Sequence, residues 1–496
     1  MSTSPDTPVR VRFAPSPTGY LHIGGARTAL FNWLFARRHD GVFILRVEDT
    51  DRKRFVPDAL DDIMAGLRWL GLQWDEGPEV GGEAGPYFQS ERLELYHEWA
   101  NWLIENGQAY RCTCTPERLK RVREEQQKAK QNPGYDRHCR TLNHGPDVGE
   151  HVVRFAMPLD GETVVHDLIR GDITFQNDML EDLVLLKSDG FPTYHLANVV
   201  DDHFMRISHI MRADEWISTA PLHVQLYQAL GWEMPAIAHM PVILNPSGKG
   251  KLSKRTQAFD DSGQKVLVQL REYREAGYLP EAVVNFLTNI GWSFGDDREI
   301  FTVEETIPRF SLERINPAGG KFPFDKLVWL NGQWTQRLAV DDLVERLRPW
   351  LRDAGLDVDD EVLRQVIPLI QMRIKTLPDI VEWAGFFFRE EITPAAEDLV
   401  GKKMTPESTL EALRRGHEVL SGLDDFSPQS QESALRALAE ELELKAGQLF
   451  GVVRVAVTGQ HVAPPLFETL EIVGRETTLK RLAAAQTLLE GSIDRV

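Results

Sequence analysis

The chain has 496 residues, enough for two to four domains with buried cores, and its composition (42% hydrophobic, 26% charged) is that of a globular protein. No apolar run has the length of a membrane span, no secretion-signal pattern opens the chain, and three cysteines are too few for a disulfide scaffold, so we expect a cytoplasmic protein. The net charge of −19 gives the chain as a whole no attraction to a polyanion, which leaves only local basic patches for any nucleic-acid contact.

The stretch from 11 to 38 predicts a buried strand, a turn rich in proline and glycine, and an amphipathic helix that begins near Gly25. The N-terminal end of such a helix carries partial positive charge, so an anion should bind at the turn. Neither GxxxxGK[ST] nor GxGxxG is present, which argues against a P-loop NTPase and a dinucleotide enzyme. His22 lies at the start of the helix, where the residues alone fit a phosphate donor or a simple helix cap.

The apolar run from 41 to 47 predicts a second strand of a parallel sheet, followed by Glu48. Ligands of open α/β sheets bind at the carboxyl ends of the strands, which places Glu48 where it can hold a cationic amine. A solvated acidic loop is the alternative. Helices are expected at 57–71 and 91–107.

Residues 109–189 have the texture of an insertion with its own small sheet, and they contain all three cysteines. Cys112, Cys114 and Cys139 are soft ligands, but a structural zinc site needs four. The nearby candidates for the fourth ligand are Tyr135, His138 and His144. Three reduced cysteines without metal are the alternative.

The next segment predicts a strand that delivers Arg212 to its carboxyl end, again at the ligand edge of the sheet. Tyr194 and Asn198 are four residues apart and share one face if their segment is helical. Taken singly, these residues also fit a core tyrosine and a surface arginine.

A glycine-rich basic loop at 244–255 is suited to phosphates, although a generic surface loop has the same composition. From 266 onward the pattern is almost wholly helical, and the expected helices include Ala282–Ile290, Val340–Leu351, Val362–Ile370, Leu410–Leu420 and Ser433–Leu444. Basic and aromatic residues alternate in this half as a reader of single-stranded RNA requires, and solvated helix faces explain them equally well.

Several short segments occur in one order along the chain: HIGG at 22–25, VEDTDR, YHLAN, RADEW, KLSKR at 251–255, RVAVTG and LFETLE. This ordered set resembles the class I aminoacyl-tRNA synthetases, and specifically the bacterial glutamyl-tRNA synthetases, over nearly the full length. The resemblance implies a doubly wound, Rossmann-like α/β core with an α+β insertion and an all-α C-terminal half.

The implied divisions are a catalytic domain at 1–108 and 191–245, an acceptor-stem insertion at 109–190, a basic-loop and stem-contact region at 246–330, and anticodon-binding domains at 331–496. The implied activity is ATP-dependent ligation of L-glutamate to tRNA-Glu through glutamyl-adenylate, in protein synthesis. ATP with Mg²⁺ would be used, the first step would need bound tRNA, and the enzyme would act as a monomer. Charging of tRNA-Gln stays open.

The resemblance also implies roles for individual residues. Catalysis is expected from His22, Lys251 and Lys254. The ATP site is expected to comprise Pro15, Ser16, Gly19, His22, Gly24, Gly25, Lys251, Leu252, Ser253 and Lys254. The glutamate site is expected to comprise Arg12, Ala14, Ser16, Glu48, Tyr194, Asn198, Arg212 and Trp216. The anticodon site is expected to comprise Arg373, Arg436, Arg454, Leu466 and Phe467. Zinc ligands are expected at Cys112, Cys114, Tyr135 and Cys139, because position 141 is threonine where some relatives have histidine.

Three other functions compete with this interpretation. A shortened relative that modifies a tRNA base lacks the anticodon half that residues 331–496 supply. An inactive RNA-binding paralogue is disfavoured by the intact His22, Lys251 and Lys254. A small-molecule adenylyltransferase or ligase would use the same turn without RNA.

Overall fold

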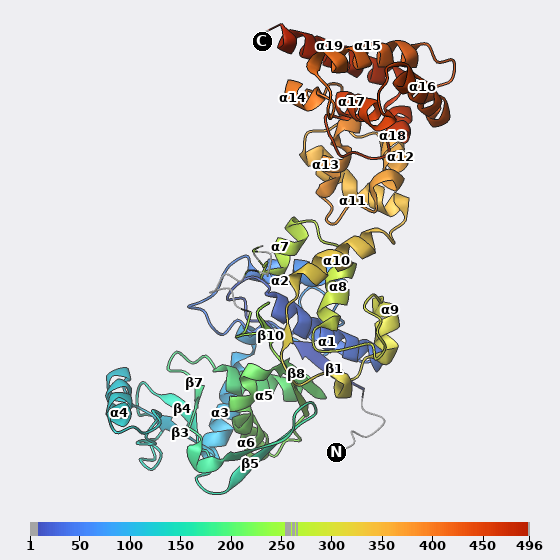
Figure 1. Cartoon of the computed structure of the whole chain (residues 1–496). Coiled ribbons are helices and arrows are strands. Elements are labelled where there is room, and N and C mark those ends of the chain that lie inside the picture. The colour runs from blue at the N-terminus through green and yellow to red at the C-terminus, as the bar shows by residue number, and fades with distance from the viewer. Residues whose placement is uncertain (1–7, 253–258, 260–262, 264–265, 495–496) are drawn as a thin grey trace. The chain divides into compact units, whose positions relative to one another are not determined.

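The computed structural model describes residues 8–252, 259, 263 and 266–494. These residues form two compact units (Figure 1). The first extends to Arg274 and also contains Pro280–Leu327, and the second contains Glu275–Leu279 and the chain from Val328 onward. Within the described ranges, no helix has both the length and the apolar character needed to cross a membrane.

A mainly parallel sheet forms the centre of the first unit. Its strands are β1 (Arg10–Phe13), β2 (Val42–Leu45), β5 (Glu162–Asp167), β6 (Gly171–Gln176), β8 (His209–Ala213) and β9 (Ala236–Met240). β1 pairs with β2, β8 with β9 and β9 with β5, all in parallel, and β6 is antiparallel to β5. Ser208 donates its N–H to the Arg10 carbonyl (2.9 Å), which places β8 on the side of β1 opposite β2. The direction of winding therefore reverses between β1 and β8, where doubly wound folds bind ligands.

The helices and short strands around this sheet are α1 (Ile23–Arg38), α2 (Ala59–Trp69), α3 (Leu93–Glu105), α5 (Tyr194–Phe204), α6 (Ala220–Leu230), α7 (Leu270–Glu275), α8 (Pro280–Asn289), α9 (Val303–Thr306), β10 (Ile243–Leu244) and β11 (Gly320–Lys321). The helix α1 begins at Ile23, close to the expected start near Gly25. The expectation that it is amphipathic was wrong, because the helix is buried on almost every side. Asn32 donates to the Met211 carbonyl in the sheet (3.1 Å), and Phe31 packs on Phe310 (5.3 Å between ring centroids). Because both faces of α1 are covered, one apolar stripe does not describe it.

The insertion forms a three-stranded antiparallel sheet from β3 (Ala109–Cys112), β4 (Val152–Phe155) and β7 (Val184–Leu186), together with α4 (Pro116–Lys128). The hairpin β5–β6 lies within the same part of the sequence but pairs with β9 of the central sheet. The insertion is thus joined to the core by backbone hydrogen bonds, among them Leu168 N–H to the Ile237 carbonyl (2.8 Å).

The second unit is helical in its described residues, as expected. Its helices are α10 (Phe324–Thr335, mostly in this unit), α11 (Val340–Asp353), α12 (Asp360–Ile370), α13 (Asp379–Ala384), α14 (Ala396–Leu399), α15 (Pro406–Ser421), α16 (Pro428–Glu441), α17 (Ala446–Thr458), α18 (Leu466–Val473) and α19 (Arg475–Ile493). Two apolar cores divide it, one between Leu343 and Ala384 and one between Leu399 and Leu489.

Candidate functional site

The turn after β1 is held by backbone hydrogen bonds from three directions. Pro15 and Pro17 accept from the N–H groups of Glu48 (3.0 Å) and Val56 (2.9 Å). Ile23 N–H donates to the Val268 carbonyl (2.9 Å), so the chain that follows the basic loop returns to the HIGG segment. The HIGG segment is therefore joined to the chain at Val268, beyond the basic loop.

His22 is the N-cap of α1. Its Nδ1 accepts a hydrogen bond from the Gly24 N–H at 2.9 Å, so a neutral His22 carries its proton on Nε2. The cap interpretation is correct, and it is compatible with phosphate binding because the cap fixes the tautomer that can donate from Nε2. A Cβ on Gly24 would lie 3.3 Å from His22 Nδ1, which explains a glycine there. Pro15, Gly19 and Gly25 are partly exposed and Ser16 is exposed along this turn.

A buried ionic network lies under the turn. Arg12 binds Asp202 through Nε and Nη2 (2.9 and 3.0 Å), and Arg46 donates to the same carboxylate (2.7 Å). Arg46 also pairs with Glu48 (3.2 Å). With its amide oxygen facing the arginines, Asn198 accepts from Arg46 (3.0 Å) and Arg12 (3.3 Å). Arg12 was expected to face glutamate, and its Nε–Nη2 edge faces Asp202 instead.

The network continues to a second aspartate. Asp201 accepts from Arg92 (2.7 Å), Tyr96 (2.9 Å) and Gln89 (2.8 Å). Burial raises the pKa of Glu48, although the Arg46 and Arg12 charges oppose it. Glu48 is 9% exposed, so the solvated-loop alternative for this residue was wrong.

Arg212, near the carboxyl end of β8, is a buried cation surrounded by neutral groups. Its guanidinium donates to Tyr194 OH (3.0 Å), His239 Nε2 (3.0 Å) and the Trp216 carbonyl (3.4 Å), and it contacts His223 Nδ1 (3.1 Å). It is 5% exposed, and no carboxylate of the described residues forms an ion pair with it. A buried charge without a counter-ion is costly, so this site is prepared for an anionic ligand.

The histidines around Arg212 stay neutral at ordinary pH. Burial and the Arg212 charge lower the pKa of His195 to about 4 and lower that of His223 well below its usual range. Arg212 is therefore the one cation that this group presents to a ligand.

Aromatic rings and a cavity border the same place. Tyr194 stacks on Trp216 with ring centroids 4.2 Å apart. A cavity of about 420 Å³ is lined by Tyr194, His195 and Trp216, and it reaches Tyr135 and Arg154 of the insertion. Tyr194 and Asn198 both lie on the helix α5, so the condition for their sharing one face is met. Ala14 directly follows β1 and is partly exposed.

The basic loop is described only in part. β10 leads into a hairpin in which Leu252 N–H donates to the Ile243 carbonyl (2.9 Å). Lys251 forms an ion pair with Glu215, and both side chains are about half exposed. Ser253 and Lys254, expected to bind ATP, lie outside the described residues.

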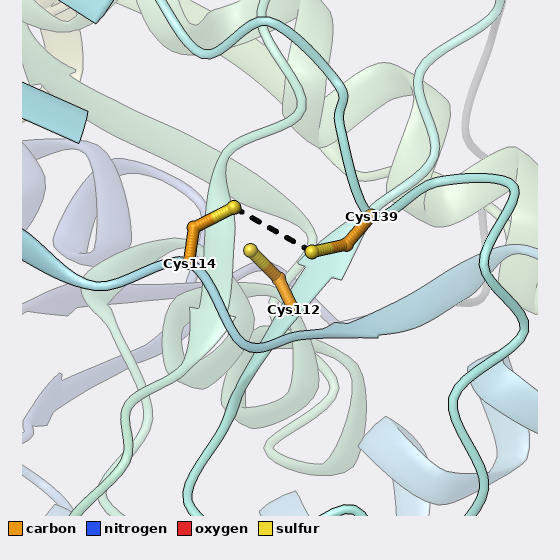
Figure 2. A group of neighbouring side chains, drawn as sticks. All are labelled: Cys112, Cys114 and Cys139. Atoms are coloured by element: carbon orange, nitrogen blue, oxygen red, sulfur yellow. Dashed lines mark hydrogen bonds between the residues drawn. The ribbon is translucent and has the colours of Figure 1, made fainter. Parts of the chain in front are cut away.

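The three cysteines of the insertion converge (Figure 2). Their sulfur atoms all lie within 4.8 Å of one another, and Cys114 and Cys139 are 3.5 Å apart. Tyr135 OH lies 3.2 Å from the Cys112 sulfur and 3.8 Å from that of Cys114. A tetrahedral zinc site with Zn–S bonds of about 2.3 Å has sulfur atoms about 3.8 Å apart, so the four groups fit such a site.

The expected anticodon residues form two groups within the second unit. Arg373 lies over the Trp383 ring (4.8 Å) and donates to the Ala463 carbonyl (3.2 Å). Burial and the charge of Arg373 lower the pKa of Arg454, whose Nε has no partner among the described residues.

Arg436 belongs to the other group. It pairs with Glu432 (2.6 Å) and lies over Phe450, which packs edge-on against Phe467 (5.1 Å). Leu466 is 5% exposed and belongs to the apolar core.

Sequence reasoning missed the partners of the arginines. Asp202 lies four residues after Asn198 on the same helix, α5. This spacing places both on one helix face and could have indicated that Asp202 belongs to the same site. Asp167 and His239 lie on β5 and β9, and only the pairing of those strands brings them to Arg212.

Comparison with known proteins identifies the family. Residues 8–329 match the family model described as tRNA synthetases class I (E and Q), catalytic domain, and residues 342–486 match an anticodon binding domain. The chain is 49% identical over 484 residues to a glutamate–tRNA ligase of Dehalococcoides mccartyi, covering 96% of this chain and 97% of that protein. It is also 49% identical over 500 residues to one of Roseiflexus sp., with 97% of each chain covered.

A solved structure agrees with these matches. The glutamate tRNA ligase of Elizabethkingia meningosepticum, crystallised in complex with its amino acid, has a TM-score of 0.86 and 35% identity, with 97% of this chain and 100% of that chain covered. The chain belongs to the class I aminoacyl-tRNA synthetases of the glutamyl and glutaminyl family.

Proposed function

We propose that this chain is a glutamate–tRNA ligase, which activates L-glutamate with ATP and transfers it to tRNA-Glu in protein synthesis. The observation that carries the glutamate assignment is Arg212, a buried guanidinium whose described partners are all neutral. The side-chain carboxylate of glutamate supplies the missing anion. Neutral glutamine would leave the charge uncompensated, which gives the site a physical basis for selecting the acid.

The remaining glutamate contacts follow from the same corner of the sheet. Glu48 holds the α-amine, Tyr194 and Trp216 form the aromatic wall, and Asn198 and Arg12 supply polar groups beneath. Ala14 and Ser16 line the entry of the turn. Glu48 contacts Arg46 through Oε1 (3.2 Å), and its other oxygen, Oε2, is the one proposed to accept from the ammonium group.

Activation is an in-line attack of the glutamate α-carboxylate on the α-phosphorus of ATP, releasing pyrophosphate, and it needs positioning and charge stabilisation rather than a protein nucleophile. His22 donates from Nε2 to the phosphates, while the turn backbone at Pro15, Gly19, Gly24 and Gly25 packs on the nucleotide. Lys251 leaves Glu215 for the departing pyrophosphate, and Leu252, Ser253 and Lys254 complete that side. Mg²⁺ brought with ATP supplies further charge neutralisation. A hydroxyl of the terminal tRNA ribose then attacks the acyl carbon and AMP leaves.

Pyrophosphate exchange tests this function. We expect exchange of labelled pyrophosphate into ATP that requires L-glutamate and also requires tRNA-Glu, since binding of the cognate RNA assembles the site. Glutamate-dependent exchange at the same rate without RNA would assign the chain to the small-molecule ligases. Absence of exchange with all substrates present would indicate an inactive RNA-binding paralogue.

Zinc is proposed at Cys112, Cys114, Cys139 and Tyr135, where it would tie β3 to the loop before Cys139. We expect about one equivalent of zinc in protein purified without chelator, and less than about half an equivalent would contradict the site. Cys139→Ser should lose the metal. Tyr135→Phe should lose its zinc to a chelator more readily than the wild type, whereas His144→Ala should retain zinc as the wild type does. The reverse result would make His144 the fourth ligand.

Discrimination between tRNAs is proposed to depend on Arg373, which reads the third anticodon base, with Arg454, Arg436, Phe467 and Leu466 around the middle base. Arg373 and Arg454 repel each other in the absence of RNA, so an acceptor-rich base or phosphate relieves them. Arg373→Gln should lower the ratio of tRNA-Glu to tRNA-Gln charging rates by about 5- to 100-fold, the scale of one base contact. Arg364→Gln, on the surface of α12, is the matched control. An unchanged ratio in Arg373→Gln removes Arg373 from the reading site.

Action as a monomer in the cytoplasm completes the proposal. Charging tRNA-Glu and tRNA-Gln side by side determines whether the enzyme also serves tRNA-Gln.

A further inference from the structure

A buried chain of hydrogen bonds lies behind Arg212 and crosses three neighbouring strands. Asp167 ends β5, His239 lies on β9, and Arg212 lies opposite His239 in the β8–β9 register. Asp167 Oδ2 is 2.6 Å from His239 Nδ1, and His239 Nε2 is 3.0 Å from Arg212 Nε. All three side chains are at least 95% buried.

The direction of each of these hydrogen bonds follows from Arg212, which is at one end of the series. The Arg212 Nε–H can only donate, so His239 Nε2 accepts. The proton of a neutral His239 is then on Nδ1 and donates to Asp167. Asp167 also accepts the backbone N–H groups of Ile169, Arg170 and His239 (2.9 Å each), so its carboxylate cannot rotate.

The interposed imidazole has a consequence for the charge of Arg212. A carboxylate in direct contact would orient the guanidinium but would also neutralise it and compete with an acidic ligand. A neutral imidazole fixes the same orientation and leaves the positive charge uncompensated at contact distance, with the Asp167 charge one ring further away. Tyr194 and His223 bind the other side of the guanidinium, and they are also neutral acceptors.

We propose that Asp167 and His239 are positioning residues for amino-acid selection: they hold Arg212 in register through a neutral hydrogen bond, so that its charge is left for the substrate carboxylate. This inference rests on the proposed function. It predicts that His239 and Asp167 control the KM for glutamate and the preference over glutamine, with little effect on ATP.

Two amide variants of His239 separate its two hydrogen bonds. His239→Gln places an amide oxygen near the position of Nε2 and keeps the acceptor for Arg212. His239→Asn places its amide near Nδ1 and keeps only the donor to Asp167. In exchange assays with tRNA-Glu, we expect His239→Asn to raise the KM for L-glutamate about 10-fold or more and to reduce the preference over L-glutamine, with the KM for ATP unchanged. His239→Gln should stay within about threefold of the wild type.

Asp167→Asn tests the series of hydrogen bonds from the end opposite Arg212. An asparagine amide cannot accept all four N–H groups that Asp167 accepts, so it no longer fixes the tautomer of the His239 imidazole. We expect the glutamate KM to rise as in His239→Asn. His209→Gln, at the far end of β8, is the matched control and should change neither KM.

The outcomes separate the two claims. If His239→Gln and His239→Asn lower kcat alike and leave the glutamate KM unchanged, the residues are merely structural and the inference is wrong. A variant that loses folded protein lowers the active fraction without moving KM, so the split between KM and kcat keeps its meaning. If the wild type itself shows no glutamate-dependent exchange, the proposed function fails instead.

Discussion

Replacing Arg212 with methionine should raise the KM for L-glutamate by about 100-fold or more in tRNA-dependent pyrophosphate exchange. Removing one member of a buried, hydrogen-bonded charge pair costs about 2–5 kcal/mol. In the bound state, Arg212→Met leaves the substrate carboxylate in a buried site without its cation. In the ligand-free protein the variant loses hydrogen bonds to neutral groups rather than an ion pair with a described residue, so the KM, which does not depend on the fraction of folded protein, is the quantity to compare.

Arg212→Lys should recover only part of this loss. A lysine ammonium retains the charge, but it cannot donate to Tyr194, His239 and a carboxylate in the planar arrangement of a guanidinium. Arg212→Met should also narrow the preference for glutamate over glutamine, because the penalty for a neutral substrate side chain at this position disappears with the buried charge.

Arg68→Met is the matched control. Arg68 lies on α2 and forms an exposed ion pair with Glu79. This variant should leave both kinetic constants near those of the wild type. A glutamate KM within about threefold of the wild type in Arg212→Met would show that another cation binds the side-chain carboxylate.

The positions of Glu48 and Arg212 could be predicted from the sequence because the signal is local. Each follows or ends a short apolar strand, and the carboxyl ends of parallel strands meet at one edge. The convergence of the three cysteines could also be predicted, because they lie close together in the sequence. For these residues a short window contains most of the information.

The partners of these residues could not be predicted in that way. Arg12 and Asp202 are 190 positions apart, and Asp167 meets His239 only because the β5–β6 hairpin joins the central sheet. A histidine or an aspartate in an apolar run carries no local mark of what it faces. Strand order decides these contacts, and the sequence pattern indicated a parallel sheet without specifying its order.

For the helix α1 a local sequence pattern was present, but it led to the wrong prediction. Its apolar spacing suggested one buried face, whereas Arg27 and Asn32 are buried as well and bond to backbone carbonyls. Polar residues in a helix pattern usually mark the solvent face, and here they satisfy carbonyl groups of neighbouring elements instead.

The second large effect concerns stability. Asp202→Asn should strongly destabilise the first unit, by about 3–5 kcal/mol, because it removes one carboxylate and leaves Arg12 and Arg46 with an uncompensated buried charge. Urea unfolding followed by tryptophan fluorescence, together with hydrogen exchange of the β1 and β2 amides, measures the loss. Hydrogen exchange assigns the loss to the first unit, because two compact units need not unfold in one cooperative step. Glu79→Gln, which breaks an exposed pair, is the control and should cost less than about 1 kcal/mol.

The difference between the wild type and Asp202→Asn should depend on pH in a defined direction. Burial alone would raise the pKa of Asp202, but the charges of Arg12 and Arg46 and their hydrogen bonds outweigh it and hold this pKa below its usual range. A carboxylate with a lowered pKa in the folded state stabilises the fold above its unfolded pKa of about 3.9, and this contribution is lost as the pH falls through the lower folded value. The wild type and the variant should therefore differ most at neutral pH and converge below about pH 4. A difference that stays constant or widens with acid would place the stabilisation in packing rather than in the charge of Asp202.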